Sequence, residues 1–128
     1  MHKRINPKGI KGSPSYSHAT EVINPTRLLE IAGQVGRDGN GDIPDGIEAQ
    51  AEIAWSNLSR VLAEANMQMQ DLVSTTIYLI HRTDNEAFDR VRDRWLGEIK
   101  PASTKLYISG LAHPKMLCEI QAVAATGS

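Results

Sequence analysis

Glu119 is the carboxylate whose position in the sequence most favours chemistry. It interrupts an apolar run, Met116-Leu117-Cys118-Glu119-Ile120, that is typical of a strand. Alternation along a strand predicts that Glu119 shares a face with Leu117, Gln121 and Val123. A carboxylate in that position either pairs with a neighbouring strand or lines a cleft, where it could move a proton or position water. Both interpretations stay open from the residues alone.

We predict no metal site from the histidines, the acidic segment 38–42 or the single cysteine. The histidines lack the spacing of a metal cluster, and we interpret them as solvated or hydrogen-bonded. They are His2, His18, His81 and His113. The segment 38–42, Asp-Gly-Asn-Gly-Asp, copies the first half of a calcium loop, but Ile43 and Ala49 stand where glycine and a bidentate glutamate are required. We therefore predict a tight turn there. Cys118 has no cation beside it in sequence, which favours a buried structural cysteine over a nucleophile.

Gly33 lies in the run Gly33-Gln34-Val35-Gly36, which is too short for a dinucleotide-binding fingerprint. A glycine in a strand indicates close approach of the backbone to something, either a neighbouring strand or a ligand. Basic residues cluster near the N-terminus, and we expect them to form a solvated, mobile arm in preference to an RNA contact. They are Lys3, Arg4, Lys8 and Lys11.

Composition excludes several classes of protein. The 128 residues carry 14 basic and 15 acidic side chains, a formal net charge of −1, so the strong positive field of general nucleic-acid binders is missing. A single cysteine excludes a disulfide-stapled scaffold. No apolar run approaches the ~18 residues that span a bilayer, and no apolar stretch follows the basic N-terminus. We expect one domain over residues 1–128, located in the cytoplasm, with no membrane contact.

Two helices and several strands are expected. Apolar residues recur at steps of three and four from Ile47 to Ala65, with Asp45 and Glu48 as a capping box and Asn66 as terminator. A second helix is predicted from a start signal at Thr83 and Glu86 to Gly97. Strands are predicted over residues 16–23, 28–32, 73–80, about 105–109 and 117–123.

This order of elements has a consequence for assembly. Two helices can cover only one face of such a sheet, whereas the strand at 73–80 has apolar residues on both faces: Ile77 and Leu79 on one, Tyr78 and Ile80 on the other. An uncovered apolar face usually marks an association surface. We therefore predict a homo-oligomer that packs sheet against sheet.

Four segments together form a recognisable pattern. They are Pro14-Ser15-Tyr16-Ser17-His18-Ala19, Ala32-Gly33-Gln34-Val35, the strand segment 71–79, and Pro101-Ala102-Ser103 through Glu119-Ile120-Gln121-Ala122. In order and spacing, over nearly the whole chain, they resemble the Rid family (reactive intermediate deaminases, also called the YjgF or endoribonuclease L-PSP family). The resemblance implies an α+β, chorismate-mutase-like single domain with a mixed β-sheet, two helices on one face, and a homotrimer with small-molecule clefts between subunits.

The resemblance also implies a chemistry and a set of site residues. Best-known members hydrolyse reactive enamines or imines, such as 2-aminoacrylate, to a keto acid and ammonia without a cofactor. Catalytic Glu119 and the substrate-binding residues Tyr16, Ser17 and Gly33 match the family pattern. Ser103 stands where the family has an arginine that grips the substrate carboxylate, and a serine offers one neutral hydrogen bond in its place.

Two further positions depart from the family. Lys105 replaces a cysteine of some members, and Arg92 replaces an asparagine of the second helix. Either could restore a positive charge to the cleft, or both could be solvated at the surface. Three hypotheses follow: a hydrolase of imine-like metabolites that acts poorly on carboxylated imines, a non-catalytic metabolite-binding or sensor trimer, and an endoribonuclease that inhibits translation, which the near-neutral charge disfavours.

Overall fold

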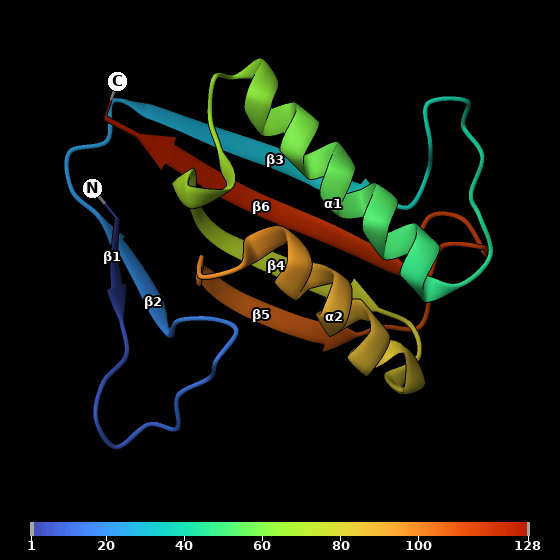
Figure 1. The fold of residues 1–128 in the computed structure, drawn as a ribbon, viewed down its shortest axis with the longest axis horizontal. Coiled ribbons are helices and arrows are strands. Elements are labelled where there is room, and N and C mark those ends of the chain that lie inside the picture. Colours follow the sequence, from blue (N-terminus) through green and yellow to red (C-terminus); the bar gives the residue numbers. More distant parts are fainter. Residues whose placement is uncertain (1, 128) are drawn as a thin grey trace.

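Two helices lie side by side on one face of a four-stranded sheet in the computed structural model, which describes residues 2–127 (Figure 1). The sheet contains β3 (Arg27–Val35), β6 (Cys118–Thr126), β4 (Leu72–Leu79) and β5 (Ala102–Tyr107), in that spatial order. β4 and β5 are parallel, whereas β6 is antiparallel to both of its neighbours. The expected mixed sheet with two helices on one face is confirmed.

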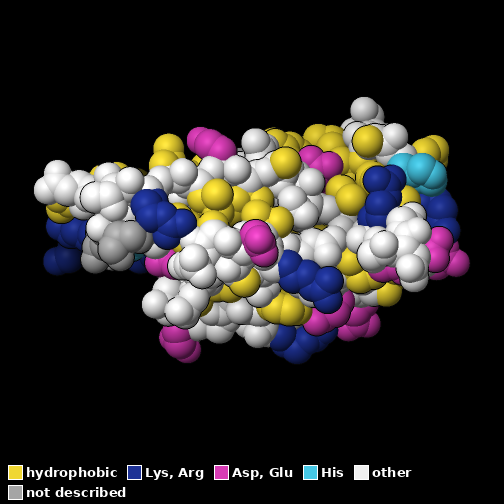
Figure 2. Space-filling view, turned by 90° about the horizontal axis from the view of Figure 1, so that it is seen from above, with side chains coloured by type: hydrophobic (Ala, Val, Ile, Leu, Met, Phe, Trp, Pro, Cys, Tyr) yellow, Lys and Arg dark blue, Asp and Glu magenta, His cyan; other side chains and the backbone are white. Residues whose placement is uncertain are grey.

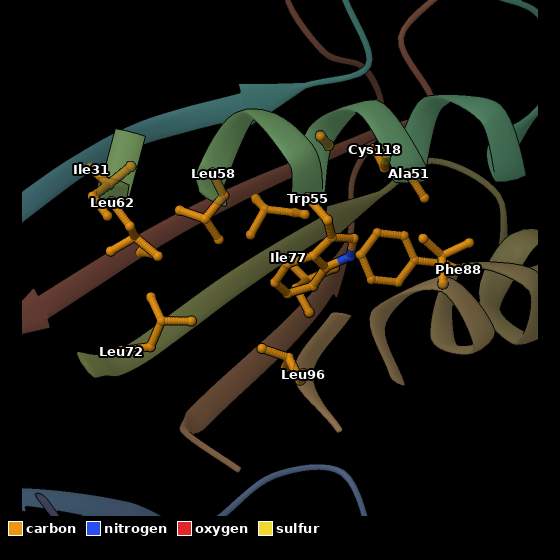
Figure 3. Close-up of a cluster of buried hydrophobic side chains, with 14 of the residues drawn as sticks. Ile31, Ala51, Trp55, Leu58, Leu62, Leu72, Ile77, Phe88, Leu96 and Cys118 are labelled. Atoms are coloured by element: carbon orange, nitrogen blue, oxygen red, sulfur yellow. The ribbon is translucent and has the colours of Figure 1, made fainter. Parts of the chain in front are cut away.

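The helices α1 (Ile47–Glu64) and α2 (Asn85–Leu96) bury their apolar stripes against the sheet. Trp55 of α1 and Phe88 of α2 point toward each other above Ile77 of β4 (Figure 3). Leu79 and Ile120, which alternate toward the helices, are fully buried. Burial of these apolar side chains is the main stabilising contribution to the fold, and it fixes which strand residues face α2 and the site beside it.

The helix ends match the sequence only in part. Asn66 adopts a left-handed conformation with φ 57°, as expected for a terminator, and Gly97 ends α2 with φ 57°. The capping box was wrong, because Gly46, with φ 89°, occupies the cap position of α1 and no side chain caps it. The start signal at Thr83 was also displaced. A 3-10 turn (Arg82–Asp84) precedes α2, so that Asp84 becomes the cap residue.

The strand boundaries differ most where polar residues begin or end a strand. β2 covers only Ala19–Val22 of the predicted strand at 16–23. β5 begins at Ala102, three residues earlier than expected, because pairing with β4 compensates for the polar residues Ser103 and Thr104. Leu117 lies one residue before the start of β6 and is half-buried against the core.

The N-terminal segment is not the mobile arm that its basic residues predicted. β1 (His2–Ile5) pairs with β2 in a separate two-stranded sheet beside the main one (Figure 1). The Arg4 guanidinium donates to Thr20 Oγ1 at 2.7 Å and to the Leu72 carbonyl at 2.9 Å. The second of these hydrogen bonds attaches the pair β1 and β2 to Leu72, the first residue of β4. A charged donor makes a stronger hydrogen bond to a buried carbonyl than a neutral donor does.

The helix-free face of the main sheet is mixed rather than apolar. Leu28 and Leu106 are 64% and 44% exposed. Between them, Tyr78 Oη donates to Gln121 Oε1 at 3.1 Å. Figure 2 looks at the molecule from above relative to Figure 1, so not onto this face, and shows basic and acidic side chains interspersed with hydrophobic ones. The expectation of a simple apolar face was therefore wrong, because polar residues alternate with apolar ones across β4 and β6.

Candidate functional site

A cleft of about 350 Å³ opens between α2, β5 and the loop that precedes β2. Its lining is mostly polar and consists of Ser13, Ser15, Tyr16, Asp89, Arg92, Ser103 and Lys105. Four residues singled out from the sequence therefore meet here. They are Tyr16, Arg92, Ser103 and Lys105. A concave site with a few convergent polar groups is the usual form of a small-molecule site.

The two basic residues of the cleft are held by carboxylates. Lys105 Nζ lies 2.5 Å from Asp89 Oδ1 and also donates to Asn85 Oδ1 at 2.5 Å. Arg92 Nη1 lies 3.2 Å from the same Asp89 oxygen, and Arg92 Nε donates to Asp93 Oδ1 at 3.1 Å. The i,i+3 spacing of Asp89 and Arg92 brings them together on α2. Neither cation is simply solvated at the surface.

Ser103 is directed to the helix side of the sheet by its partner strand. It pairs with Thr75 of β4, and Thr75 Oγ1 donates to Ser103 Oγ at 3.0 Å. The Ser103 hydroxyl therefore keeps its own proton available for a ligand in the cleft. Because Thr75 is buried, this hydrogen bond fixes the orientation of Ser103 as well as satisfying Thr75.

Tyr16 and Ser17 diverge, although they are neighbours in sequence. Tyr16 lines the cleft, and its ring lies edge-on to His18, with centroids 5.8 Å apart. Ser17 is buried; its N–H donates to the Pro101 carbonyl at 3.2 Å, and its Oγ accepts from Asn6 Nδ2 at 3.4 Å. Ser17 thus attaches the loop to the start of β5 and is not among the residues that line the cleft.

Glu119 and Gly33 lie together, but away from this cleft. The register of β3 and β6 shifts between Ile31 and Gln34, which places Gly33 in a bulge beside Glu119. A Cβ atom built on Gly33 would overlap the Glu119 carboxylate. Of the two explanations for this glycine, close approach to a neighbouring strand is therefore the one the structure supports.

The cleft and Glu119 are on opposite faces of the sheet. Glu119 pairs with Tyr78, which alternates to the helix-free face, whereas Ser103 pairs with Thr75, which faces the helices. Within one chain, the sheet itself separates the Glu119 carboxylate from the hydroxyls of the cleft. Any site that uses both must draw them from two copies of the chain.

The other candidate residues take structural roles. Burial raises the pKa of the Cys118 thiol to about 12, and the nearby carboxylates of Asp84 and Glu119 act in the same direction. Asp38 Oδ1 accepts from the N–H groups of Asn40 and Asp42, which gives the predicted tight turn. Within residues 2–127 no group of three His, Cys, Asp or Glu side chains could hold a metal ion.

Some site residues had no clear signal in the sequence. Asp89 lies three positions before Arg92 on the same helix, a spacing from which an ion pair could have been inferred. Ser13 and Ser15 belong to an irregular loop, so nothing in their spacing indicates the cleft.

No helix of the described residues is long and apolar enough to cross a membrane.

The fold and cleft together define an α+β protein with a polar cleft beside its second helix. Comparison with known proteins identifies the family. The sequence profile described as Endoribonuclease L-PSP matches residues 8–126, and the chain belongs to this family, which is also the Rid or YjgF family.

Individual relatives agree with this assignment. A RutC family protein of Pyrococcus abyssi is 34% identical over 120 residues, covering 91% of each chain. The 2-iminobutanoate/2-iminopropanoate deaminase of Mus musculus is 28% identical over 114 residues, covering 88% of this chain and 82% of its own. The crystal structure of the Rid family protein YyfB of Yersinia pestis, a protein of unknown function, superposes with a TM-score of 0.88 at 29% identity over 98% of both chains.

Proposed function

We propose that the protein hydrolyses a small imine- or enamine-type metabolite in a cleft that a second copy of the chain completes. The observation that carries this proposal is the separation of Glu119 from the cleft by the sheet. The helix-free face that presents Glu119 is open, with Leu28 and Leu106 exposed on it. The deaminase relatives support the class of reaction.

The assembly we propose is a cytoplasmic homotrimer in which each helix-free face presents Glu119 to the cleft of the neighbouring copy. A closed ring of three identical contacts satisfies every copy equally. Sedimentation or light scattering should give about 42 kDa, which is three chains of 14.0 kDa. A monomer of 14.0 kDa would contradict the proposal.

In the proposed reaction, water adds to the carbon of the C=N bond. Glu119 accepts a proton from that water as the C–O bond forms, and it returns the proton to nitrogen. The proton of the new hydroxyl then passes to nitrogen as the C–N bond breaks, so that imine plus water gives a carbonyl compound plus ammonia. The hydroxyls of Tyr16 and Ser103 hold the substrate in position. The reaction balances without a cofactor or metal.

Ser103 limits the substrates that such a site accepts. Its hydroxyl provides one neutral hydrogen bond, whereas an arginine would provide a charge and a two-pronged donor for a carboxylate. Lys105 and Arg92 do not take over the carboxylate-binding role of that arginine, because both already contact Asp89. We therefore expect slow hydrolysis of 2-aminoacrylate and of its tautomer 2-iminopropanoate.

The test compares two imines. One is 2-aminoacrylate, generated from serine by a dehydratase; the other lacks a carboxylate and is generated from a primary amine by an amine oxidase. Carbonyl product and ammonia are followed with and without the protein. Acceleration of the carboxylate-free imine above the buffer rate is expected. No acceleration of either imine would contradict the proposed activity.

The paired charges also favour a second candidate, a non-catalytic metabolite-binding or sensor trimer. In that case a ligand would raise the melting temperature in a concentration-dependent way without being consumed. Endoribonuclease activity, which the family description names, is less favoured because the net charge is −1. RNA cleavage that persists in Glu119→Ala would not originate from the proposed site.

A further inference from the structure

Asp89 is the central charged group of the cleft. One of its oxygens, Oδ1, lies 2.5 Å from Lys105 Nζ and 3.2 Å from Arg92 Nη1. Arg92 is 7% exposed, and its second contact is with Asp93. Two cations and two carboxylates therefore form one connected cluster with a formal charge of zero. The charges of this cluster are therefore already balanced without a ligand.

The uncharged polar groups that line the cleft are hydroxyls. They belong to Ser13, Ser15, Tyr16 and Ser103. Ser103 Oγ already accepts from Thr75, so its proton points elsewhere. Hydroxyls can donate and accept, which suits amide, carbonyl and imine groups. A carboxylate would have no free cation and would lie beside the Asp89 carboxylate, where like charges repel.

We infer that Asp89 determines the specificity of the cleft and that the cleft takes small uncharged polar ligands in preference to carboxylates. The inference rests on the proposed function for the location of the site. It adds a class of substrate: imines or enamines in which an amide or hydroxyl group takes the place of a carboxylate. Asp89 holds Lys105 and Arg92 in this state and so acts against acidic ligands.

The direct test uses lactamide and lactate, which have the same shape but differ in charge. Binding to the wild-type protein is measured by ligand-observed NMR in the millimolar range. Lactamide should bind at least about tenfold more tightly than lactate. Equal or tighter binding of lactate would overturn the inference, and so would a lack of binding by both ligands.

Matched variants test the residue itself. Asp89→Asn should leave the two cations with one carboxylate, a net charge of +1, and reverse the preference, so that lactate binds more tightly than lactamide. Asp93→Asn is the control, because Asp93 also contacts Arg92 but is 60% exposed and does not line the cleft. It should keep the wild-type preference. An unchanged preference in a folded Asp89→Asn protein would overturn the role of Asp89.

The two proposals fail separately. Lactamide and lactate do not react, so their binding preference is independent of any hydrolysis. A preference for lactamide without imine hydrolysis would support the specificity and contradict the enzyme. Imine hydrolysis together with a preference for lactate would support the proposed enzyme and contradict the proposed specificity. If Asp89→Asn does not fold, the wild-type comparison still decides the specificity.

Discussion

Gly33 of β3 lies so close to Glu119 of β6 that a methyl group at position 33 would overlap the Glu119 carboxylate. The atoms that would be displaced belong to the end of the Glu119 side chain and not to the backbone. The carboxylate thus keeps its position because residue 33 has no side chain. The bulge between Ile31 and Gln34 creates this arrangement.

Gly33→Ala should therefore reduce hydrolysis without unfolding the protein. The added methyl group forces Glu119 into another rotamer, at a cost of about 1 kcal/mol, and moves its carboxylate away from the proposed water. We expect a rate loss of at least about tenfold, measured beside thermal unfolding. Gly39→Ala is the control, since nothing lies within 4 Å of a Cβ there. Equal rates for both variants would show that the position of Glu119 does not matter.

Glu119→Gln should remove general acid–base chemistry and keep the shape of the side chain. A loss of about 100-fold or more in kcat is expected for a group that transfers protons. Glu30→Gln is the control, because Glu30 pairs with Val123 on the same helix-free face. Trimer mass should be unchanged in both proteins. A fully active Glu119→Gln protein would eliminate Glu119 as the catalytic group.

Ser103→Arg should improve hydrolysis of carboxylated imines. The added arginine gives the cluster three cations and two carboxylates, a net charge of +1. Its guanidinium can hold a substrate carboxylate with two hydrogen bonds. We expect at least about a tenfold gain in kcat/KM on 2-aminoacrylate. Ser109→Arg adds the same charge at an exposed site that does not line the cleft. A gain in both variants would point to a general charge effect.

Gln50 should be important for stability rather than for activity. Its side chain is buried; Nε2 donates to the Pro44 and Lys115 carbonyls, and Oε1 accepts from the Leu117 N–H at 2.8 Å. Gln50→Leu leaves these groups without partners, so we expect a loss of about 3 kcal/mol in denaturant unfolding. The exposed Gln70→Leu should lose less than about 0.5 kcal/mol. Similar losses would disprove the role of Gln50.

Cys118 predicts a fall in stability at high pH. Burial raises the pKa of its thiol in the folded state from 9.0 to about 12. Between these values the unfolded chain loses a proton that the folded chain keeps, so stability decreases as pH rises. The slope from this group approaches roughly 1.4 kcal/mol per pH unit. Cys118→Ala, measured in parallel, should have a shallower slope between pH 9 and 12; identical slopes would refute the assignment.

Periodicity predicted those parts of the fold that depend on local burial. The steps of three and four from Ile47 gave α1, and the β-branched run around Ile77 gave β4. Apolar residues on both faces of that run left open which face packs against the helices. The start of β5 was missed, because Ser103 and Thr104 are polar and their strand depends on pairing with β4. The N-terminal caps were misplaced, because Gly46 and not Asp45 precedes α1, and Asp84 and not Thr83 precedes α2.

The candidate site was predictable in its members but not in its arrangement. Tyr16 was identified as a match to a family pattern and Ser103 and Lys105 as departures from it, and the three residues meet in one cleft. The separation of Ser103 from Glu119 depends on the register of three strands, which no local pattern determines. The spacing of Asp89 and Arg92 is local, but the contact between Asp89 and Lys105 spans 16 residues of sequence and has no local signal.

The most direct test of the account mixes two variants, each defective in a different half of the proposed site. Glu119→Gln keeps the cleft, and Tyr16→Phe with Ser103→Ala keeps Glu119. Each protein alone should be inactive. Random trimers formed by refolding an equal mixture should recover about one quarter of wild-type hydrolysis, since every mixed trimer has one intact cleft facing an intact Glu119. Mixed trimers, verified by native mass spectrometry, that remain inactive would contradict a site shared between copies.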